Sequence, residues 1–426
     1  MKVVIAGGGF GGLRLARKLN NKKGIDVILI DQYNYHQFQP LFYQVATAGL
    51  DASNISFPLR KVFQKSRNIR IRMAIIQRID TTEKMIHTDI GEISYDYLVL
   101  ATGAGTNFFG NVELEANAFS MKSTVEALQI RHRMMENLEL AVTTTDPQTL
   151  NRLMNIVVVG GGPTGVEVSG ALAEMKHYVL PKDYPELDFR KMNIFLVEGS
   201  SKVLGAMSDK SSDQALKYLH QLGVTLLTNS QVEGYDGNEL RLQDGKTIAA
   251  STVIWAAGIK GNIPGGFESV TVQRGNRLKV NEFNQVNNMQ NIFAIGDVAA
   301  MISADYPNGH PQVAPVAMQQ ADTLSLNLLK IKENSFATLE AFNYKDKGAM
   351  ATVGRNLAVV DIPKPKWHFG GFFAWLIWMA LHLMLILGVK NRLFVFLNWV
   401  YNYLTYDQSL RLIFREFNRD NSTRNI

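Results

Sequence analysis

The sequence contains no cysteine among its 426 residues. This absence excludes disulfide frameworks, cysteine-ligated zinc, iron–sulfur clusters, thiol nucleophiles and the paired thiols of disulfide reductases. Any redox chemistry in this chain therefore requires a bound organic cofactor. Charged residues are also few, at 19%, whereas 46% of the residues are hydrophobic. This composition suffices for two or three domains with buried cores and excludes a disordered chain.

Motifs for metal and serine chemistry are absent as well. The histidines show no HxxxH or HxxE spacing and no acidic loop has the calcium-binding pattern, so we expect no metal site. A serine nucleophile would need a GxSxG elbow, which the sequence lacks. The chain starts directly with the strand pattern MKVVIAGGG, with no apolar leader ahead of it. We therefore expect no secretory signal and a protein of the cytoplasm.

The net charge of +6 is concentrated near the C-terminus. Eight basic and three acidic residues follow residue 363, which leaves +1 for all earlier residues. These cations flank an apolar stretch and are not spread among exposed aromatic residues. They favour contact with anionic lipid and argue against nucleic acid. The mean hydropathy of −0.04 is far below that of a polytopic membrane protein, so any membrane contact is local.

The first residues form a nucleotide-binding pattern. The apolar run VVIAGGGFGG contains Gly7, Gly9 and Gly12 and leads into a helical pattern, and the following strand pattern VILID ends at Asp31. The first glycine permits a tight turn, the second lets the backbone approach a pyrophosphate, and the third lets helix and strand pack closely. The helix N-terminus then faces the phosphates, and the acid accepts hydrogen bonds from ribose hydroxyls. The pattern predicts a βαβ unit that binds an adenine dinucleotide.

A second copy of this unit follows in the same order. Gly160, Gly162 and Gly165 lie in the run NIVVVGGGPTG, and the later strand pattern NIFLVE ends at Glu198. This acid lies 38 residues after the first glycine, against 24 in the first copy, which indicates an insertion between helix and strand. An acid at both strand ends, rather than an arginine, favours a free 2′-hydroxyl. The two nucleotides are therefore expected to be FAD and NADH, not NADPH.

Each copy continues through short strand patterns and closes on an apolar strand, which leads into Thr102-Gly103 in the first copy and into Gly258 in the second. Two such units predict an α/β fold with two Rossmann-like domains of the glutathione reductase type. We expect four segments: an FAD-binding domain at 1–112 and 280–362, an NADH-binding domain at 113–279, and C-terminal helices at 363–426. One nucleotide held permanently beside one that exchanges favours hydride transfer from a nicotinamide to a flavin.

Three further segments give the chain a specific family resemblance. They are the run YNYHQFQPLFYQVATAG at 33–49, the segment NIFAIGDVA with Asp297, and the tryptophan-rich tail. With the two nucleotide patterns, they resemble the type II NADH dehydrogenases, single-subunit NADH:quinone oxidoreductases that do not pump protons. The resemblance spans the whole chain. It implies that non-covalent FAD accepts hydride from NADH, and that two electrons pass on to a membrane quinone, ubiquinone or menaquinone.

The resemblance also implies roles for individual residues. Glu167 matches a family glutamate placed near the nicotinamide and the flavin, although a carboxylate there also stabilises a helix N-terminus. The family's quinone-site signature AQxAxQQ matches residues 314–320, with Pro315 in place of the first glutamine. Gln319 and Gln320 are then expected to hydrogen-bond a quinone carbonyl or the flavin edge, or else to face solvent.

The remaining implied site residues hold the two nucleotides. Those implied for FAD are Gly7, Gly9, Phe10, Gly11, Gly12, Asp31, Thr102, Gly103 and Asp297. Those implied for NADH are Gly160, Gly162, Gly165 and Glu198, with Gly258 closing the second site. His36 lies in the specific run, and we expect it to be a structural hydrogen-bonding residue.

The tail contains 19 nearly uninterrupted apolar residues at 371–389. As one helix they would extend about 28 Å, close to the apolar thickness of a bilayer. Cations flank both ends, and Asn391, Asn398 and Asn402 form a narrow polar stripe on the next helical pattern. These features favour an amphipathic helical anchor at 363–426 that lies on the cytoplasmic face of the plasma membrane. A spanning helix and a homodimer interface without lipid are the alternatives.

Two other functions share the nucleotide patterns. A soluble NADH-dependent reductase of the ferredoxin or rubredoxin type would need no apolar tail. A non-enzymatic, NADH-sensing membrane-associated flavoprotein would need no quinone site. A sulfide:quinone oxidoreductase would need catalytic cysteines, which the chain lacks. The apolar tail has no chain of ionisable residues, so we expect no proton pumping.

Overall fold

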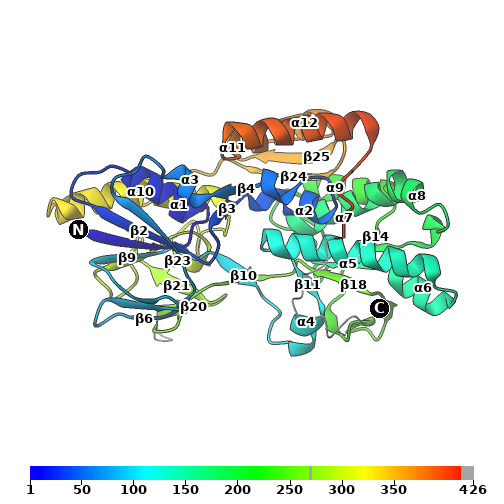
Figure 1. Cartoon of the computed structure of the whole chain (residues 1–426), viewed down its shortest axis with the longest axis horizontal. Coiled ribbons are helices and arrows are strands. Elements are labelled where there is room, and N and C mark those ends of the chain that lie inside the picture. The colour runs from blue at the N-terminus through cyan, green and yellow to red at the C-terminus, as the bar shows by residue number, and fades with distance from the viewer. Residues whose placement is uncertain (268–270, 414–426) are drawn as a thin grey trace, which may run out of the picture.

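The computed structural model describes residues 1–267 and 271–413 and has three parts. Figure 1 shows one dinucleotide-binding domain on the left, a second on the right, and a C-terminal sheet with two helices above them. The predicted α/β fold with two Rossmann-like domains is confirmed.

The first domain is built on a five-stranded parallel sheet. Its strand order is β22-β9-β1-β2-β5. The strands are β1 (Lys2–Ala6), β2 (Asp26–Asp31), β5 (Ile69–Met73), β9 (Tyr97–Leu100) and β22 (Ile292–Ala294). Helices α1 (Phe10–Leu19) and α10 (Ala314–Lys332) pack against each other and against this sheet. The central strands are buried on both faces, as their continuous apolar runs require.

The second domain repeats this plan. Its parallel sheet has the order β11-β18-β12-β13-β14. The strands are β11 (Phe119–Ser120), β12 (Ile156–Val159), β13 (Ile194–Val197), β14 (Thr225–Leu227) and β18 (Thr252–Trp255). The helices are α4 (Val112–Asn117), α5 (Thr124–Thr143), α6 (Pro147–Met154), α7 (Pro163–Tyr178), α8 (Leu180–Asp183) and α9 (Asp209–Gln221). The insertion expected before Glu198 is the end of α7 together with α8 and the loop that follows.

Smaller sheets complete each domain. In the first domain they contain β3 (Tyr35–Gln37), β4 (Ser56–Pro58), β6 (Ile76–Asp80), β7 (Met85–Thr88), β8 (Gly91–Ser94), β20 (Val272–Gln273), β21 (Arg277–Val280) and β23 (Ala299–Met301), with α3 (Leu59–Val62) after β4. In the second they are β15 (Val232–Tyr235), β16 (Glu239–Leu242) and β17 (Thr247–Ala249). An antiparallel ribbon of β10 (Ala104–Thr106) and β19 (Ile259–Gly261) connects the two domains.

The C-terminal part begins with an antiparallel sheet. Its strands are β24 (Ala349–Gly354), β25 (Leu357–Ile362) and β26 (Trp367–Gly370). The sheet packs on α7 and α9 of the second domain. The expected segment boundaries at 279/280 and 362/363 lie within β21 and between β25 and β26. Because both would divide a sheet, we propose boundaries at the β10–β19 ribbon and near residue 347.

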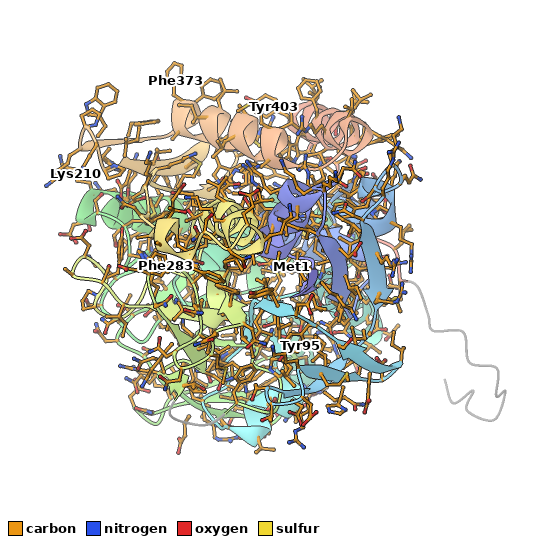
Figure 2. The ribbon with its side chains drawn as sticks, turned by 90° about the vertical axis from the view of Figure 1, so that its left-hand side faces the viewer. Met1, Tyr95, Lys210, Phe283, Phe373 and Tyr403 are labelled. Atoms are coloured by element: carbon orange, nitrogen blue, oxygen red, sulfur yellow. The ribbon has the colours of Figure 1, made fainter. Side chains whose placement is uncertain are left out.

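Two helices follow this sheet and form the top of the molecule. They are α11 (Phe372–Leu385) and α12 (Val389–Thr405), so the apolar stretch 371–389 is not one continuous helix. None of the helices within the described residues combines the length and the apolarity that crossing a bilayer requires. Figure 2 shows both helices along the upper surface, with Phe373 pointing away from the domains. The part of the predicted anchor after residue 413 lies outside the described residues.

One close contact fixes the C-terminal sheet on the second domain. Gly170 in the middle of α7 faces the backbone of β24, and a Cβ atom built on it would lie 1.5 Å from the Val353 carbonyl oxygen. The helix and the strand therefore touch backbone to backbone, which only glycine permits. This sheet also packs against α11, so the contact contributes to the placement of the C-terminal helices.

We expect Gly170→Ala to destabilise the protein by about 2 kcal/mol or more, because the added methyl group forces α7 and β24 apart. Helix propensity alone would predict the opposite sign, a gain of about 1 kcal/mol. Urea unfolding of the purified variant measures the difference. Unchanged or increased stability would show that the sheet does not depend on this contact.

Candidate active site

The first glycine loop has the geometry that a dinucleotide requires. Gly7 has φ +109, and a Cβ atom on it would lie 2.2 Å from the Ala101 carbonyl oxygen. A Cβ atom on Gly12 would lie 1.9 Å from the Gly7 carbonyl oxygen, which shows the close packing of helix and strand. In contrast, no atom lies within 4 Å of a Cβ built on Gly9. The loop is closed on the protein side and open where a pyrophosphate would approach the N-terminus of α1.

The second loop has the same geometry. Gly160 also has φ +109, and a Cβ atom on Gly165 would lie 1.8 Å from the Gly160 carbonyl oxygen. The space beside Gly162 is open to 4 Å. Gly258, which closes this unit, has φ +85 and lies against the ring of Phe109. The sequence repeat is therefore also a structural repeat.

Each predicted ribose-binding acid lies beside its own loop. The Asp31 carboxylate accepts hydrogen bonds from the backbone N–H of Gly8 at 2.6 Å and of Tyr33 at 2.7 Å. The Glu198 carboxylate accepts in the same way from Gly161 at 2.5 Å and from Ser200 at 2.7 Å. Burial raises the pKa of Asp31, and its two backbone hydrogen bonds oppose that shift.

Other residues predicted for FAD gather at the same edge of the first sheet. Thr102 follows β9, and its hydroxyl donates to the Asn262 carbonyl at 2.5 Å. Gly103 follows with φ +69. Asp297 follows β22; burial raises the pKa of its carboxyl, while the nearby cations Lys122 and Arg277 lower it. Because carboxyl ends of parallel strands meet at one edge, these residues and the glycine loop face one site.

The aromatic side chains of Phe10 and His36 pack beside the first glycine loop. Phe10 opens α1 and packs edge-on against the His36 ring, with centroids 5.2 Å apart. His36 is buried, and its Nδ1 lies 3.0 Å from the Gly8 carbonyl oxygen. Gly11 packs close to Ile295. The structural role expected for His36 is confirmed by this contact.

The two predicted glutamines on α10 make contacts within the protein. Gln320 is buried, and its Oε1 accepts from the backbone N–H of Gly296 at 2.7 Å, directly beside Asp297. The Gln319 amide pairs with both backbone groups of Lys345, at 3.0 Å each. Neither is among the described residues that line the two pockets described next. Their expected contact with quinone or flavin stays a prediction.

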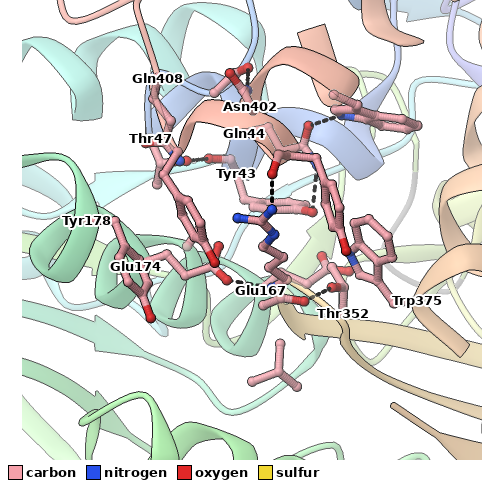
Figure 3. Close-up of a pocket in the computed structure, with 18 of the residues that line it drawn as sticks. Tyr43, Gln44, Thr47, Glu167, Glu174, Tyr178, Thr352, Trp375, Asn402 and Gln408 are labelled. Atoms are coloured by element: carbon pink, nitrogen blue, oxygen red, sulfur yellow. Dashed lines mark hydrogen bonds between the residues drawn. The ribbon is translucent and has the colours of Figure 1, made fainter. Parts of the chain in front are cut away.

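Two pockets share a wall: the inner one lies between the first two domains, and the outer one lies between them and the C-terminal sheet and helices. The inner pocket has a volume of about 350 Å³ and is lined by Gln39, Pro40, Phe42, Tyr43, Met121, Lys122, Thr164 and Glu167. The outer pocket has a volume of about 840 Å³, counting its open mouth, and its lining includes Tyr43, Glu167, Glu174, Arg355, Trp375 and Trp399. Tyr43 and Glu167 belong to both pockets. Figure 3 shows the outer pocket below α12.

Glu167 is the carboxylate of the shared wall. It lies on α7, five residues after Gly162, so it is one and a half turns from the second glycine loop. Burial raises its pKa from 4.5 to about 8, although a hydrogen bond from the Thr352 backbone opposes the shift. The side chain retains partial solvent access on the sides of the two pockets. At neutral pH it is mostly a neutral acid that can donate a proton.

Glu174 lies two turns further along the same face of α7. Its carboxylate accepts from the backbone N–H of Arg355 at 2.5 Å, and burial raises its pKa. The Arg355 guanidinium lies between the rings of Tyr403 and Tyr406, 3.9 and 3.8 Å from their centroids, and donates to the Tyr403 carbonyl. These contacts connect α7, the β24–β25 turn and the end of α12 at the mouth of the outer pocket.

Several of these residues are not among the sequence-predicted site. Tyr43 and Gln44 lie in the quoted run 33–49, but no role followed from their pattern. Glu174 has a detectable signal, because residues seven apart share one helix face with Glu167. Arg355 has no such signal, since only tertiary structure brings it to α7.

The fold and the site define a two-nucleotide oxidoreductase with an added C-terminal module. The model of the pyridine nucleotide-disulphide oxidoreductase family matches residues 1–321, and that of the NDH2 C-terminal domain matches residues 347–406. The type II NADH:quinone oxidoreductase Ndh of Mycobacterium tuberculosis is 33% identical over 417 residues, covering 95% of this chain and 88% of its own. A type II NADH:quinone oxidoreductase of Haemophilus influenzae is 30% identical and covers 84% of this chain and 86% of its own.

Solved structures show the same fold. The NDH2 structure of Plasmodium falciparum in complex with NADH superposes with a TM-score of 0.87 at 22% identity, covering 97% of this chain and 99% of that one. A sulfide:quinone oxidoreductase of Aquifex aeolicus gives a TM-score of 0.69 at 21% identity, covering 92% of each chain. The chain belongs to the type II NADH:quinone oxidoreductases, as its sequence motifs predicted.

The glycine geometry predicts different outcomes for two similar substitutions. Gly12→Ala places a methyl group against the loop backbone, so we expect lost folding or a melting temperature lowered by several degrees. In Gly9→Ala the added methyl group contacts no protein atom, so we expect the protein to fold. We expect it to bind flavin about ten-fold more weakly, because the methyl group lies where the pyrophosphate would approach the backbone. Circular dichroism of the flavin-free proteins and absorbance near 450 nm measure the two effects. If both variants lost stability and flavin binding to the same extent, the distinction between the packed position of Gly12 and the open position of Gly9 would be contradicted.

Proposed function

We propose that this chain oxidises NADH at the inner side of the shared wall and reduces a membrane quinone, ubiquinone or menaquinone, in the outer pocket. The overall reaction balances as NADH plus a proton plus quinone giving NAD⁺ and quinol. The observation that carries the proposal is the wall formed by Tyr43 and Glu167. One side of it faces the inner pocket, which Thr164 beside the second glycine loop also lines, and the other faces a pocket walled by tryptophans under an apolar helix pair.

The first domain fits FAD. The loop with Gly9, the carboxylate of Asp31 and the buried Asp297 would hold its pyrophosphate, adenosine ribose and ribityl chain. FAD supplies a two-electron acceptor that also donates electrons onward. The loop with Gly162 and the acid Glu198 would hold NADH. The protein's contribution is to orient these groups and to exclude water, not to form covalent bonds with them.

Glu167 supplies the proton-holding group in this proposal. Its pKa of about 8 keeps it protonated at neutral pH, at a position that contacts both pockets. Quinone reduction consumes protons as well as electrons, so a neutral acid beside the headgroup lowers the barrier to forming quinol. Lys122, in the inner pocket beside Asp297, adds a positive charge on the nucleotide side.

The outer surface of the helix pair fits a membrane surface. Fifteen large apolar side chains of α11 and α12 are exposed, with Phe373 at 72%, Val389 at 82% and Leu404 at 75%. Exposed Lys390 and Arg392 lie beside them, in a position to meet anionic headgroups. Contiguous exposed apolar surface of this size indicates an interaction site. Because quinones are dissolved in the bilayer, this contact would bring the outer pocket to its substrate.

We place the protein on the cytoplasmic face of the plasma membrane, where NADH is available. A homodimer that covers the same apolar face is the competing proposal. The soluble ferredoxin-type reductase leaves both the helix pair and the outer pocket unexplained. A non-enzymatic NADH sensor leaves the protonated Glu167 between two pockets unexplained.

The pH dependence of quinone turnover tests the role of Glu167. We expect turnover of a short-chain benzoquinone to fall as the pH rises through about 8, because Glu167 then loses its proton. Glu167→Gln should lower turnover by about 100-fold and remove this dependence. Steady-state rates between pH 6 and 9.5 measure both effects. A variant with the wild-type rate and profile would contradict the proposal.

The same substitution has a defined effect on stability. The folded protein keeps the Glu167 proton up to about pH 8, whereas the unfolded chain releases it near the ordinary value of 4.5. Between these values the folded state binds more protons, so wild-type stability falls as the pH rises. Gln at this position has no proton to lose. We expect the stability difference to grow in favour of Glu167→Gln from about pH 4.5 to pH 8, as measured by urea unfolding.

Membrane docking is tested by adding charge to the exposed face. We expect the double variant Phe373→Asp, Leu404→Asp to bind vesicles of phosphatidylcholine with 30% phosphatidylglycerol at least about ten-fold more weakly, because aspartate resists entering the interface. Co-sedimentation measures the binding. Turnover of a long-chain quinone in the vesicles should fall with it. Sedimentation velocity tests the competing dimer. If the wild type is a dimer, the variant is a monomer and neither binds vesicles, then the apolar face contacts a second copy of this chain and not lipid.

A further inference from the structure

A chain of three side chains connects α12 with the wall between the pockets. Gln44 lies on α2 (Phe42–Ala46), and its amide joins two aromatic groups. The Trp399 indole Nε1 donates to Gln44 Oε1 at 2.7 Å, and Gln44 Nε2 donates to the Tyr43 hydroxyl at 2.8 Å. Figure 3 shows Gln44 directly above Tyr43, at the side of the outer pocket.

The chemistry of these three side chains determines which atom donates in each of the two hydrogen bonds. An indole N–H can donate a hydrogen bond but cannot accept one, so Trp399 must contact the oxygen of the Gln44 amide. The amide nitrogen then points to Tyr43 and donates to its oxygen. The Tyr43 hydroxyl accepts this bond, so its own hydrogen is left for another partner.

The surroundings of Tyr43 show where that partner lies. The side chain is 7% exposed and lines both pockets beside Glu167. Burial, with the nearby Glu167 carboxyl, raises the pKa of Tyr43 well above 10. The phenol therefore keeps its hydrogen over the physiological pH range and is available to donate it to an acceptor in either pocket.

We propose that the Tyr43 hydroxyl donates a hydrogen bond to a carbonyl oxygen of the quinone headgroup, and that Trp399 is a positioning residue that orients this donor through Gln44. The inference rests on the proposed quinone reduction and assigns the contact that recognises the headgroup. Tyr43 keeps its proton throughout; the donor stabilises the negative charge that develops on the carbonyl oxygen as two electrons arrive. The two protons of the quinol come from other groups.

This arrangement connects the membrane-facing helix with substrate recognition. The same segment of the first domain receives further hydrogen bonds from α12. Asn402 donates to the Gly49 carbonyl at 3.0 Å, and Asn391 donates to the carbonyls of residues 53, 54 and 56 at 3.1 to 3.2 Å. The position of α12 on α2 therefore determines whether the donor points into the pocket.

The test uses four variants of the full-length flavoprotein. Tyr43→Phe removes the donor. Trp399→Phe removes the indole N–H, so the Gln44 oxygen becomes free to accept the Tyr43 hydrogen and withdraws it from the pocket. The double variant combines both. Trp378→Phe is the matched control, because Trp378 packs near Tyr43 and Trp399, with ring centroids 6.3 Å from each, but takes no part in the chain.

The readout is kcat/KM for a short-chain benzoquinone divided by that for ferricyanide, which has no carbonyl to bind. This ratio cancels any effect on flavin reduction by NADH. We expect about a ten-fold loss in Tyr43→Phe and in Trp399→Phe, and no further loss in the double variant, because both changes remove one donor. We expect Trp378→Phe to lose less than about two-fold. Multiplied losses in the double variant, or an equal loss in Trp378→Phe, would overturn the proposal.

A spectroscopic measurement separates recognition from packing. A hydrogen bond lowers the stretching frequency of a quinone carbonyl, so infrared difference spectra with ¹³C-carbonyl-labelled benzoquinone should show a shifted band in the wild type. The shift should be absent in Tyr43→Phe and in Trp399→Phe. An unshifted wild-type band would reject the donor even if quinone is reduced. A wild-type protein that reduces ferricyanide but no quinone would instead reject the proposed function itself.

Discussion

The backbone contact between α7 and β24 is the constraint on which the site depends. Helix α7 starts at the second glycine loop, contacts β24 at Gly170, and carries Glu167 and Glu174 on either side of that contact. One rigid helix thereby holds the second glycine loop, the wall between the pockets and the mouth of the outer pocket at fixed distances from one another. A change in the distance between α7 and β24 would move Glu167 and Glu174 together relative to the C-terminal sheet and to Arg355, which follows β24.

The C-terminal helices reverse the usual arrangement of a surface helix. In α12 the polar side chains Asn391 and Asn402 face inward and donate to backbone carbonyls of residues 49–56, while most of the large apolar side chains, apart from Val395 and Trp399, are exposed. The inward asparagines donate to several backbone carbonyl groups, and these bonds fix the rotation of the helix about its axis. That rotation directs Trp399 toward Gln44 and leaves the apolar face exposed. The proposed docking and the proposed recognition of the headgroup thus depend on the same orientation of α12.

The sequence was most informative where the geometry is local. The spacing of Gly7, Gly9 and Gly12 reports steric limits within a dozen residues, and the acid at the end of the next strand lies beside the loop because adjacent parallel strands are in register. The geometry of both glycine loops, the two-domain fold and the position of Glu167 on its helix could therefore be predicted. The segment boundaries stay predictions, because strand pairing joins residues on either side of 279/280 and 362/363.

The outer pocket was beyond such reasoning because its walls come from segments far apart in the chain. Tyr43 and Trp399 are 356 residues apart and meet through one amide. Neither residue lies in a sequence pattern that predicts its contact with the other. Gln319 and Gln320 match a family motif in the sequence, but in the structure their amides contact the backbone of Lys345 and Gly296.

The shared wall explains how the two half-reactions can be kept apart. In the proposed function, separate pockets beside Tyr43 and Glu167 would let the nucleotide and the quinone approach from different directions, one from water and one from the apolar surface. Neither substrate then needs to leave before the other enters. The wall contains one neutral donor, Tyr43, and one protonated acid, Glu167, and Lys122 adds a cation on the side of the inner pocket.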